Sequence, residues 1–345
     1  MRAVVYDRYG GPEVLHVEDV AKPVPKNDEV LVRIYAVAVT RADCATRQAN
    51  RRSGRGFELV SRAIFGLRRP RQPILGGDFS GVVEAVGPAV KEFAAGDEVF
   101  GSTGIRFGAY AEFISRPESS RITRKPKSLS RVEAAGITDG GLYALSPLRA
   151  ANVKNGDSVL VYGASGAIGT AGVQLAKYFG AQVTAVTSTK NLELVKSLGA
   201  DHVIDYTKED FTKNGQSYDV IFDAVGKHSF VRSRNSLKPG GRFLPTDGFD
   251  NLLRVLTTRF QDKKVIFPAG AVTKKEVVFL KELIEAGRYR VVIDRTYALE
   301  DVVEAHRYVD TEQKVGNVIL TVSDSISDSP DYPASWDPER PDSPD

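Results

Sequence analysis

A glycine-rich turn between an apolar run and a helical pattern is the stretch of this sequence best suited to binding a ligand. It reads Gly163-Ala164-Ser165-Gly166-Ala167-Ile168-Gly169, directly after the apolar residues 159–162. Apolar residues at helical spacing follow, and Gly180 is suited to end that helix. In such a strand–turn–helix unit, backbone amides and the helix N-terminus can bind the pyrophosphate of a dinucleotide. The glycine spacing is G-x-x-G-x-x-G rather than G-x-G-x-x-G, so an isolated match would also fit a turn that merely needs small residues.

The end of the next expected strand indicates which dinucleotide binds. It reads Thr187-Ser188-Thr189-Lys190, with no carboxylate. A site for NAD usually has Asp or Glu there to accept a hydrogen bond from the ribose 2′-hydroxyl, whereas hydroxyl groups and an ammonium group favour a 2′-phosphate. We therefore expect NADPH as the cofactor, with Ser188 and Lys190 at its 2′-phosphate and Tyr206 closing the site. The alternative is that Lys190 is a solvated residue at the start of the next helix.

Strands and helices alternate after the glycine turn. Apolar runs at residues 183–186, 203–204, 220–222 and 242–244 predict four further strands, and residues 192–198 predict a helix. This alternation predicts an α/β fold with a parallel, doubly wound sheet. Residues at the carboxyl ends of such strands face the cofactor, so we expect contacts from Val225, Gly226, Leu244 and Thr246.

The N-terminal part has a different pattern, with many short strands separated by Gly and Pro turns. Strands are expected at residues 2–6, 14–17, 30–39, 78–86, 99–100 and 108–114, which is typical of a compact, barrel-like β domain. A helix should start at Ser130, because Glu133 completes a capping box. Further helices are expected at 274–286 and 300–309. Strands at 290–297 and 317–323 have no place in the parallel sheet, so we expect them to rejoin the N-terminal domain.

These patterns give four segments. They are a β domain at 1–125, a dinucleotide-binding domain at 126–268, a return to the β domain at 269–322 and a disordered acidic tail at 323–345. The tail has seven acidic residues and one basic residue, although the net charge of the chain is +3. Nine arginines lie between residues 41 and 71.

Composition excludes some classes of protein. There is no apolar run of the roughly 18 residues that a membrane span needs. The chain starts with a strand-like segment instead of a signal peptide. The single cysteine, Cys44, excludes an internal disulfide and is consistent with a reducing cytoplasm.

Several segments together resemble the medium-chain dehydrogenase/reductase superfamily, and more narrowly its zinc-lacking quinone oxidoreductase branch. They are GGDFSGVVEAVG at 76–87, GAYAEF at 108–113, the glycine turn, LGADHVIDY at 198–206 and FDAVG at 222–226. The resemblance covers residues 1–322. It implies a GroES-like β domain and a Rossmann domain with the active site in the cleft between them. It also implies a homodimer formed by extending the Rossmann sheets.

The zinc ligands of related dehydrogenases are missing from the matching positions. The first ligand position holds Thr40, the second holds Gly77, and residues 136–140 contain no cysteine. A structural zinc site made of four cysteines cannot form with one cysteine, and the four histidines are scattered. We therefore expect no metal.

Without a metal, hydride transfer to an acceptor that is already activated is the chemistry that fits. A quinone or another α,β-unsaturated carbonyl needs alignment with the cofactor and a hydrogen bond to the developing oxyanion. The resemblance places Thr40 and Asp43 at an Asn-x-x-Asp position that lines the cleft, and Tyr143 beside the nicotinamide. It also places Asn317 at a C-terminal contact with the cofactor. Asp43 could instead be structural, Tyr143 could be a core aromatic, and the proton could come from water or a tyrosine.

Two further functions remain open. The acceptor could be a 2-enone or an enoyl thioester, so that a carbon–carbon double bond is reduced. Alternatively, the chain could bind NADPH with little turnover and act through its Arg-rich surface on RNA or a membrane. No RNA-binding module is recognisable, so we expect no nucleic-acid partner. The segment from Arg47 to Arg71 could be a helical lid whose apolar face selects a hydrophobic substrate.

Overall fold

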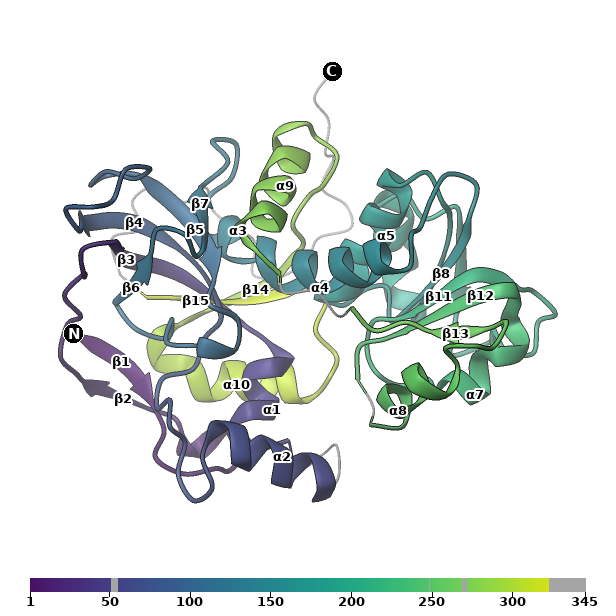
Figure 1. Cartoon of the computed structure of the whole chain (residues 1–345), viewed down its shortest axis with the longest axis horizontal. Helices are drawn as coiled ribbons and strands as arrows, with labels where there is room; N and C mark the ends of the chain where they lie inside the picture. Colours follow the sequence, from purple (N-terminus) through teal and green to yellow (C-terminus); the bar gives the residue numbers. More distant parts are fainter. Residues whose placement is uncertain (51–54, 248, 269–271, 323–345) are drawn as a thin grey trace. The chain divides into compact units, whose positions relative to one another are not determined.

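The computed structural model describes residues 1–50, 55–247, 249–268 and 272–322, which form two compact units (Figure 1). The first unit contains the described residues of 1–143, 272–292 and 296–322, and the second contains those of 144–268 and 293–295. The expected acidic tail at 323–345 lies outside the described residues. Within the described ranges, no helix is long and apolar enough to cross a membrane.

The first unit is built on a seven-stranded sheet in which β14, β15, β3, β4, β5 and β7 are neighbours in that order and β6 also pairs with β3. The long central strand β3 has mostly buried residues because it is covered on both sides. The strands of this sheet are β3 (Glu29–Val39), β4 (Asp78–Val86), β5 (Glu98–Ser102), β6 (Phe113–Pro117), β7 (Arg121–Arg124), β14 (Ile293–Ala298) and β15 (Asn317–Thr321). Strands β1 (Arg2–Val5) and β2 (His16–Asp19) pair in a separate two-stranded sheet. The C-terminal strands therefore rejoin the N-terminal domain, as the sequence predicted.

Helices of the first unit begin at capping residues that the sequence supplies. Thr40, Ser130 and Thr273 each complete a capping box with an acidic residue three positions later. The helices are α1 (Arg41–Arg47), α2 (Arg55–Phe65), α3 (Arg131–Ala135), α9 (Lys274–Glu285) and α10 (Val302–Asp310), with short 3-10 turns η1 (Pro12–Val14), η3 (Gly104–Arg106) and η6 (Leu299–Asp301). Helix α4 (Ile137–Ala150) starts in the first unit and continues into the second.

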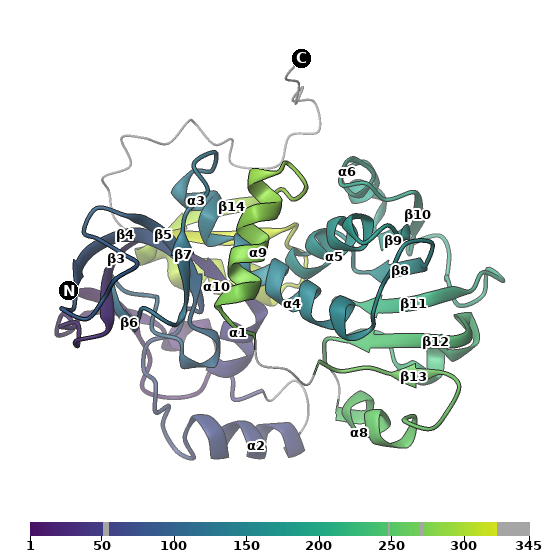
Figure 2. The same cartoon turned by 45° about the horizontal axis from the view of Figure 1, so that its top comes forward.

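The second unit is a six-stranded parallel sheet with strand order β10-β9-β8-β11-β12-β13 (Figure 2). The order reverses at β8, so the crossovers on its two sides place helices on opposite faces of the sheet. The strands are β8 (Ser158–Tyr162), β9 (Gln182–Thr187), β10 (His202–Asp205), β11 (Tyr218–Asp223), β12 (Leu237–Pro245) and β13 (Lys264–Val265). The helices are α5 (Ala167–Tyr178), α6 (Leu192–Ser197), α7 (Phe230–Ser233) and α8 (Phe249–Thr257), with 3-10 turns η4 (Thr189–Asn191) and η5 (Arg234–Ser236). The predicted doubly wound sheet is confirmed.

Two expectations about the first unit differ from the structure. A strand was expected at 108–114, but β6 begins at Phe113 and Ala111 makes only an isolated bridge to Ala3. Phe107 and Gly108 have φ angles of 48° and 101°, which no regular strand has. The first unit also extends to residue 143 instead of 125, because α3 packs on β3 and β4.

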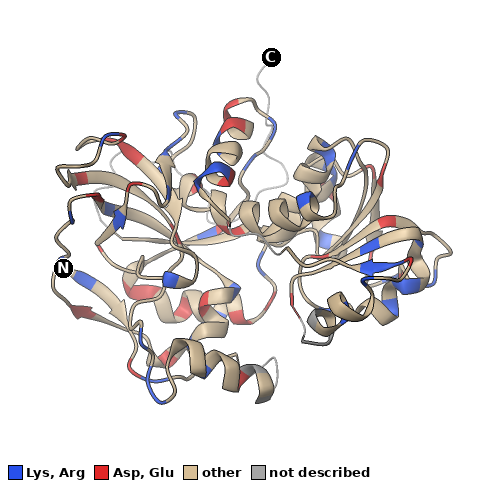
Figure 3. Cartoon of the chain, viewed as in Figure 1, with Lys and Arg blue, Asp and Glu red and all other residues tan. Residues whose placement is uncertain are grey.

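Charge is mixed on both units, and the Arg-rich segment is divided between two environments (Figure 3). Helix α2 is amphipathic, with Leu59 and Ile64 exposed, while Phe65 packs against the core of the unit. By contrast Arg47, at the end of α1, is completely buried. The hypothesis that the segment from Arg47 to Arg71 forms a helical lid therefore does not hold for Arg47, which is a core residue.

Candidate functional site

The glycine turn connects β8 to α5 at the point where the strand order reverses. Gly163 has a φ angle of 76°, and its backbone N–H, like that of Ala164, donates to the Val186 carbonyl at 3.0 Å. A Cβ atom at Gly163 would lie 2.4 Å from a methyl group of Val225, and one at Gly169 would lie 2.1 Å from the Gly163 carbonyl oxygen. These two glycines are therefore needed for the turn itself.

The middle glycine of the turn, Gly166, is not required by the backbone conformation or by packing inside the protein. Gly166 is the N-cap of α5, and its φ of −75° and ψ of 172° are open to any residue. A Cβ atom there would have only one neighbour within 4 Å, the Gly163 carbonyl oxygen at 3.8 Å. The protein leaves this space open at a helix N-terminus, where an anion is stabilised by backbone N–H groups. The turn therefore fits the pyrophosphate of a dinucleotide.

The tip of β9 is joined to the glycine turn by polar side chains. Ser165 Oγ accepts hydrogen bonds from Thr187 Oγ1 at 2.9 Å and from Asn191 Nδ2 at 3.1 Å. The same Asn191 amide donates to Ser188 Oγ at 3.3 Å. The Tyr206 backbone N–H donates to the Thr187 carbonyl at 3.0 Å. The predicted residues Ser165, Ser188 and Tyr206 thus lie together, and Asn191 is a member that the sequence analysis missed.

The ends of β11 and β12 provide the remaining expected contacts of the second unit. Val225 packs against Gly163, and Thr246 Oγ1 donates to the Asp223 carbonyl at 2.9 Å. Gly226 has a φ angle of 67°, which favours glycine. Leu244 is fully buried, so its side chain serves the core and only its backbone is available to a ligand.

Thr40 and Asp43 form the capping box of α1 and are buried. Asp43 Oδ2 accepts from the backbone N–H and the hydroxyl of Thr40 at 2.9 and 2.7 Å, and Asp43 Oδ1 accepts from Gly76 N–H at 3.0 Å. Burial raises the pKa of Asp43 to about 6 despite these donors. Because the Thr40 hydroxyl proton is directed at Asp43, it is not available to a substrate carbonyl.

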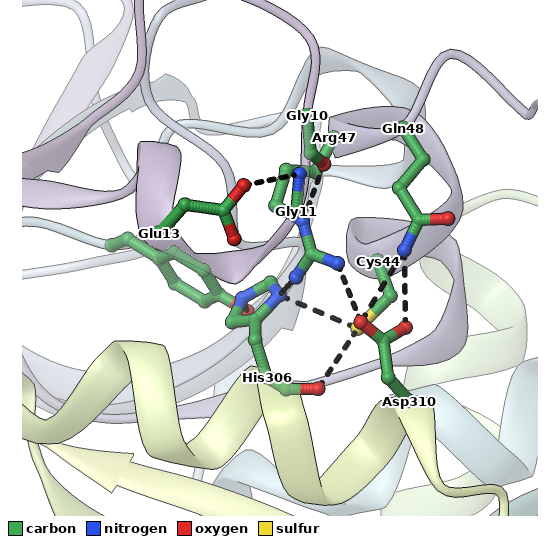
Figure 4. A network of polar contacts seen from close by, with 9 residues as sticks. Gly10, Gly11, Glu13, Cys44, Arg47, Gln48, His306 and Asp310 are labelled. Atoms are coloured by element: carbon green, nitrogen blue, oxygen red, sulfur yellow. Dashed lines mark hydrogen bonds and ion pairs between the residues drawn. The ribbon is translucent and has the colours of Figure 1, made fainter.

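A second buried network joins the end of α1 to α10 (Figure 4). The guanidinium of Arg47 contacts Asp310 Oδ2 at 2.6 Å and His306 Nδ1 at 2.7 Å. A guanidinium can only donate, so His306 Nδ1 is the acceptor and Nε2–H faces the Tyr110 hydroxyl at 3.2 Å. Burial, together with the nearby charge of Asp43, raises the pKa of Tyr110 well above its ordinary value. Burial and Arg47 hold the pKa of His306 well below its ordinary value, so His306 is a neutral core residue.

Two further carboxyl groups lie next to α4, and the sequence analysis assigned neither a role. Asp78 begins β4, opposite Ser102 of β5, and Asp139 lies in the first turn of α4. Both are more than nine-tenths buried. Burial and the neighbouring charge of Asp139 raise the pKa of Asp78 to about 7, and burial also raises the pKa of Asp139.

Tyr143 is the predicted catalytic residue that reaches the surface of the first unit. It lies four residues after Asp139 on α4, so the two side chains share a helix face. About half of its side chain is exposed (49%). Partial burial, followed by the charges of Asp78 and Asp139, raises the pKa of the phenol.

Asn317 lies in the first unit, unlike the other expected cofactor contacts. Its Nδ2 donates to the Val292 carbonyl at 3.0 Å, while its buried Oδ1 has no hydrogen-bond partner among the described residues. A buried amide oxygen without a donor is costly, and an external N–H such as that of a carboxamide would satisfy it. This residue also fits a nicotinamide cofactor.

The first two positions that match the zinc ligands of related dehydrogenases have no metal-binding side chain. The Thr40 hydroxyl is hydrogen-bonded to Asp43, and Gly77 has no side chain. Over the described ranges, no group of three or more His, Cys, Asp or Glu residues is placed to hold a metal ion. Cys44 is buried with its Sγ 3.3 Å from His306 Nδ1, so it belongs to the network of Arg47 and His306.

Two family models match parts of the chain. A family model described as "Alcohol dehydrogenase GroES-like domain" matches residues 26–127, and one described as "Zinc-binding dehydrogenase" matches residues 198–320. The solved structure of a quinone oxidoreductase from Coxiella burnetii matches with a TM-score of 0.80 at 28% identity, covering 94% of this chain and 99% of that chain.

Two relatives are similar over almost the whole chain. A 2-methylene-furan-3-one reductase from Solanum lycopersicum is 35% identical, covering 93% of this chain and 79% of the relative. An NADPH-dependent alkenal/one oxidoreductase, chloroplastic, from Arabidopsis thaliana is 33% identical, with the same coverage of 93% and 79%.

Proposed function

This chain belongs to the medium-chain dehydrogenase/reductase superfamily, in its quinone oxidoreductase-like branch, and we infer that it is an NADPH-dependent reductase of quinones or other α,β-unsaturated carbonyl compounds. The observation that carries this inference is the open glycine turn at the reversal of the sheet order, where Gly166 leaves space for a pyrophosphate. The named relatives that reduce enones and the structural neighbour that reduces quinones support the acceptor class.

The cofactor is NADPH, which supplies the hydride. The turn from Gly163 to Gly169 holds its pyrophosphate, while Ser188, Lys190 and Tyr206 hold the ribose 2′-phosphate. The exposed position of Lys190 in η4, shortly after β9, and the absence of a carboxylate from residues 187–190 support this assignment. Asp205 lies near, but its carboxylate is occupied by the hydroxyl groups of Thr189 and Thr207.

Side chains of the first unit are suited to bind the acceptor and to stabilise the charge that forms on it. An enone or quinone needs no Lewis acid, because its carbonyl already withdraws electrons. The protein has to orient the acceptor, exclude water and stabilise the oxyanion that forms. Tyr143 is the proposed donor, and the reaction is proposed to proceed without zinc because positions 40 and 77 lack ligands.

Enone reduction is the better-supported half of this proposal. The two relatives with 35% and 33% identity are named as reductases of a furanone and of alkenals or alkenones. In both compound classes, hydride addition at the β-carbon reduces a carbon–carbon double bond. The exposed apolar residues of α2, Leu59, Val60 and Ile64, would suit a hydrophobic acceptor if α2 borders the binding site.

Product analysis separates the two acceptor classes. The protein is incubated with NADPH and either a 2-cyclohexenone-type enone or a hydrophobic ortho-quinone, and the products are identified by mass spectrometry. The proposal expects a saturated ketone from the first or a hydroquinone from the second, in amounts equal to the NADPH consumed. An allylic alcohol as the product would overturn it, because that product requires reduction of the carbonyl itself.

The assembly and location of the protein are further parts of the proposal. We propose a homodimer formed through the edge of the parallel sheet, and a cytoplasmic location, in keeping with a single buried cysteine. Sedimentation of the purified protein at low concentration would give the mass of a monomer if the dimer is wrong.

A further inference from the structure

Helix α2 presents apolar side chains to solvent along one of its sides. Leu59, Val60 and Ile64 are 67%, 53% and 54% exposed. They lie one, four or five positions apart, so they form one stripe on the helix, which we call the apolar stripe of α2. Leu67, directly after the helix, is also exposed. In Figures 1 and 2, α2 lies at the lower edge of the first unit.

The opposite side of α2 attaches the helix to the first unit. Ser61 is only 3% exposed, and its Oγ accepts a hydrogen bond from Asn50 Nδ2 at 2.9 Å. Phe65 packs against the core of the unit, and the Tyr9 hydroxyl donates to the Gly66 carbonyl at 2.8 Å. The helix is therefore held in place by its other side, and the apolar stripe takes no part in that packing.

Three exposed arginines, Arg68, Arg69 and Arg71, follow α2 directly. The chain turns tightly before them, because Gly66 has a φ angle of 129° and a Cβ atom there would lie 2.0 Å from the Arg69 carbonyl oxygen. None of the three guanidinium groups forms an ion pair or a hydrogen bond with another residue that the structure describes. Residues 59–77 contain no Asp or Glu. The positive charge beside the apolar stripe is therefore not neutralised within this segment.

An apolar stripe next to unpaired arginines is complementary to the surface of a bilayer that contains anionic lipids. Aliphatic side chains enter the boundary between headgroups and acyl chains, while guanidinium groups bind the phosphates. A second copy docked symmetrically on the same stripe would bring the like-charged arginines of both chains together, which is unfavourable. Single-stranded RNA would pair with the arginines but would have no use for aliphatic side chains, since bases stack on aromatic ones.

We propose that α2 and the three arginines after it dock the protein onto membranes that contain anionic phospholipids, with α2 lying in the plane of the interface. The apolar stripe supplies the insertion, and Arg68, Arg69 and Arg71 supply the attraction to the headgroups. This inference goes beyond the proposed reductase activity and does not depend on it.

Vesicle flotation with the full chain tests the docking without any cofactor or acceptor. One set of vesicles contains phosphatidylcholine alone, and the other contains about 30% phosphatidylserine in phosphatidylcholine. The protein should float with the second set and hardly with the first. Binding should weaken as salt is raised, because salt screens the arginines from the headgroups. No binding to the phosphatidylserine vesicles at low salt would overturn the proposal.

A double variant of the apolar stripe tests the insertion. In Leu59→Ser/Ile64→Ser the partition onto phosphatidylserine vesicles should fall at least about tenfold. The melting temperature should not fall, since both side chains are exposed. The matched control is Leu253→Ser/Leu256→Ser, which removes two leucines that are 50% and 73% exposed on α8 of the second unit, and it should bind like the wild type. A loss in this control without a loss in the α2 variant would assign the binding to α8 and overturn the proposal.

A second double variant tests the charge. Arg68→Gln/Arg69→Gln should bind phosphatidylserine vesicles about tenfold or more weakly than the wild type, with a smaller dependence on salt. Its control is Arg259→Gln/Lys264→Gln, which removes two exposed cations from the second unit and should leave binding unchanged. Unchanged binding in Arg68→Gln/Arg69→Gln would contradict the proposal.

Two further results would identify a different partner for this surface. A dimer in sedimentation that dissociates in Leu59→Ser/Ile64→Ser would assign the apolar stripe to a second copy and overturn the proposal. Binding of a single-stranded RNA oligomer that is lost in Arg68→Gln/Arg69→Gln, without vesicle binding, would also overturn it. Vesicle binding by a protein that oxidises no NADPH would refute the proposed function and support the docking, so the two proposals fail separately.

Discussion

The Thr40 hydroxyl donates a 2.7 Å hydrogen bond to Asp43 Oδ2 and accepts a 3.1 Å hydrogen bond from the Asp43 backbone N–H. Both polar functions of this hydroxyl are therefore used inside the protein. Asp43 is anchored further by the Gly76 backbone N–H. We therefore propose that Thr40 and Asp43 position the start of α1 and that Tyr143 is the group that meets an acceptor.

Thr40→Val tests this role of Thr40. The variant keeps the side-chain shape but removes the cap of α1 and one donor to Asp43, so we expect it to lower the free energy of unfolding by about 2 kcal/mol. The KM for the acceptor should stay unchanged. Thr273→Val is the matched control, because Thr273 caps α9 in the same way but its capping box is exposed, and it should lose only about 1 kcal/mol. A strongly raised KM in Thr40→Val would instead mean that the hydroxyl holds the acceptor.

Gly166→Ala and Gly169→Ala separate cofactor contact from chain packing. The Cβ of Gly166→Ala has room in the protein, so its melting temperature should match the wild type, while NADPH affinity should fall at least about tenfold. The Cβ of Gly169→Ala would lie 2.1 Å from the Gly163 carbonyl oxygen, so this variant should lose stability by about 1–3 kcal/mol. Calorimetric titration and thermal melting measure the two quantities. Unchanged NADPH binding in Gly166→Ala would show that the turn does not hold the pyrophosphate.

Lys190→Ala tests how the cofactor is selected. Loss of a charge-assisted contact to the 2′-phosphate should weaken NADPH binding by about 1.5–3 kcal/mol, which is tenfold or more. Binding of NADH should not change, since NADH has no phosphate at this position. Lys196→Ala is the control, because that lysine pairs with Glu193 on the surface of α6. Equal losses for both cofactors in Lys190→Ala would contradict the assignment.

The buried Asp43 gives stability a specific pH dependence. Its pKa is raised from 3.8 to about 6 by burial, so between these values the folded state binds more protons than the unfolded state. Stability from this group is therefore largest below pH 3.8 and is lost as pH rises through 6. Urea unfolding should show the wild type losing about 1 kcal/mol relative to Asp43→Asn between pH 5 and 8. If the wild type instead gained stability relative to Asp43→Asn as pH rises, the folded protein would favour the ionised carboxylate of Asp43, which contradicts the raised pKa.

The sequence predicted features that depend on neighbours along the chain. The glycine turn, the alternation of strands and helices after it and the Ser130 capping box are all local patterns, and each is present. The strand expected at 108–114 failed for a local reason that composition does not reveal, the positive φ angle of Phe107.

Features that depend on distant contacts could not be predicted. Arg47 looked like one of many surface arginines, but its partners His306 and Asp310 lie at the other end of the chain.

The most direct test of the account is NADPH oxidation by chelator-treated, metal-free protein, followed by absorbance with an enone in one cuvette and an ortho-quinone in another. The account predicts rapid oxidation with at least one acceptor, and no increase when zinc is added back. Loss of activity on chelation that zinc restores would contradict the metal-free reaction. No oxidation with either acceptor, despite bound NADPH, would contradict the assignment as a reductase.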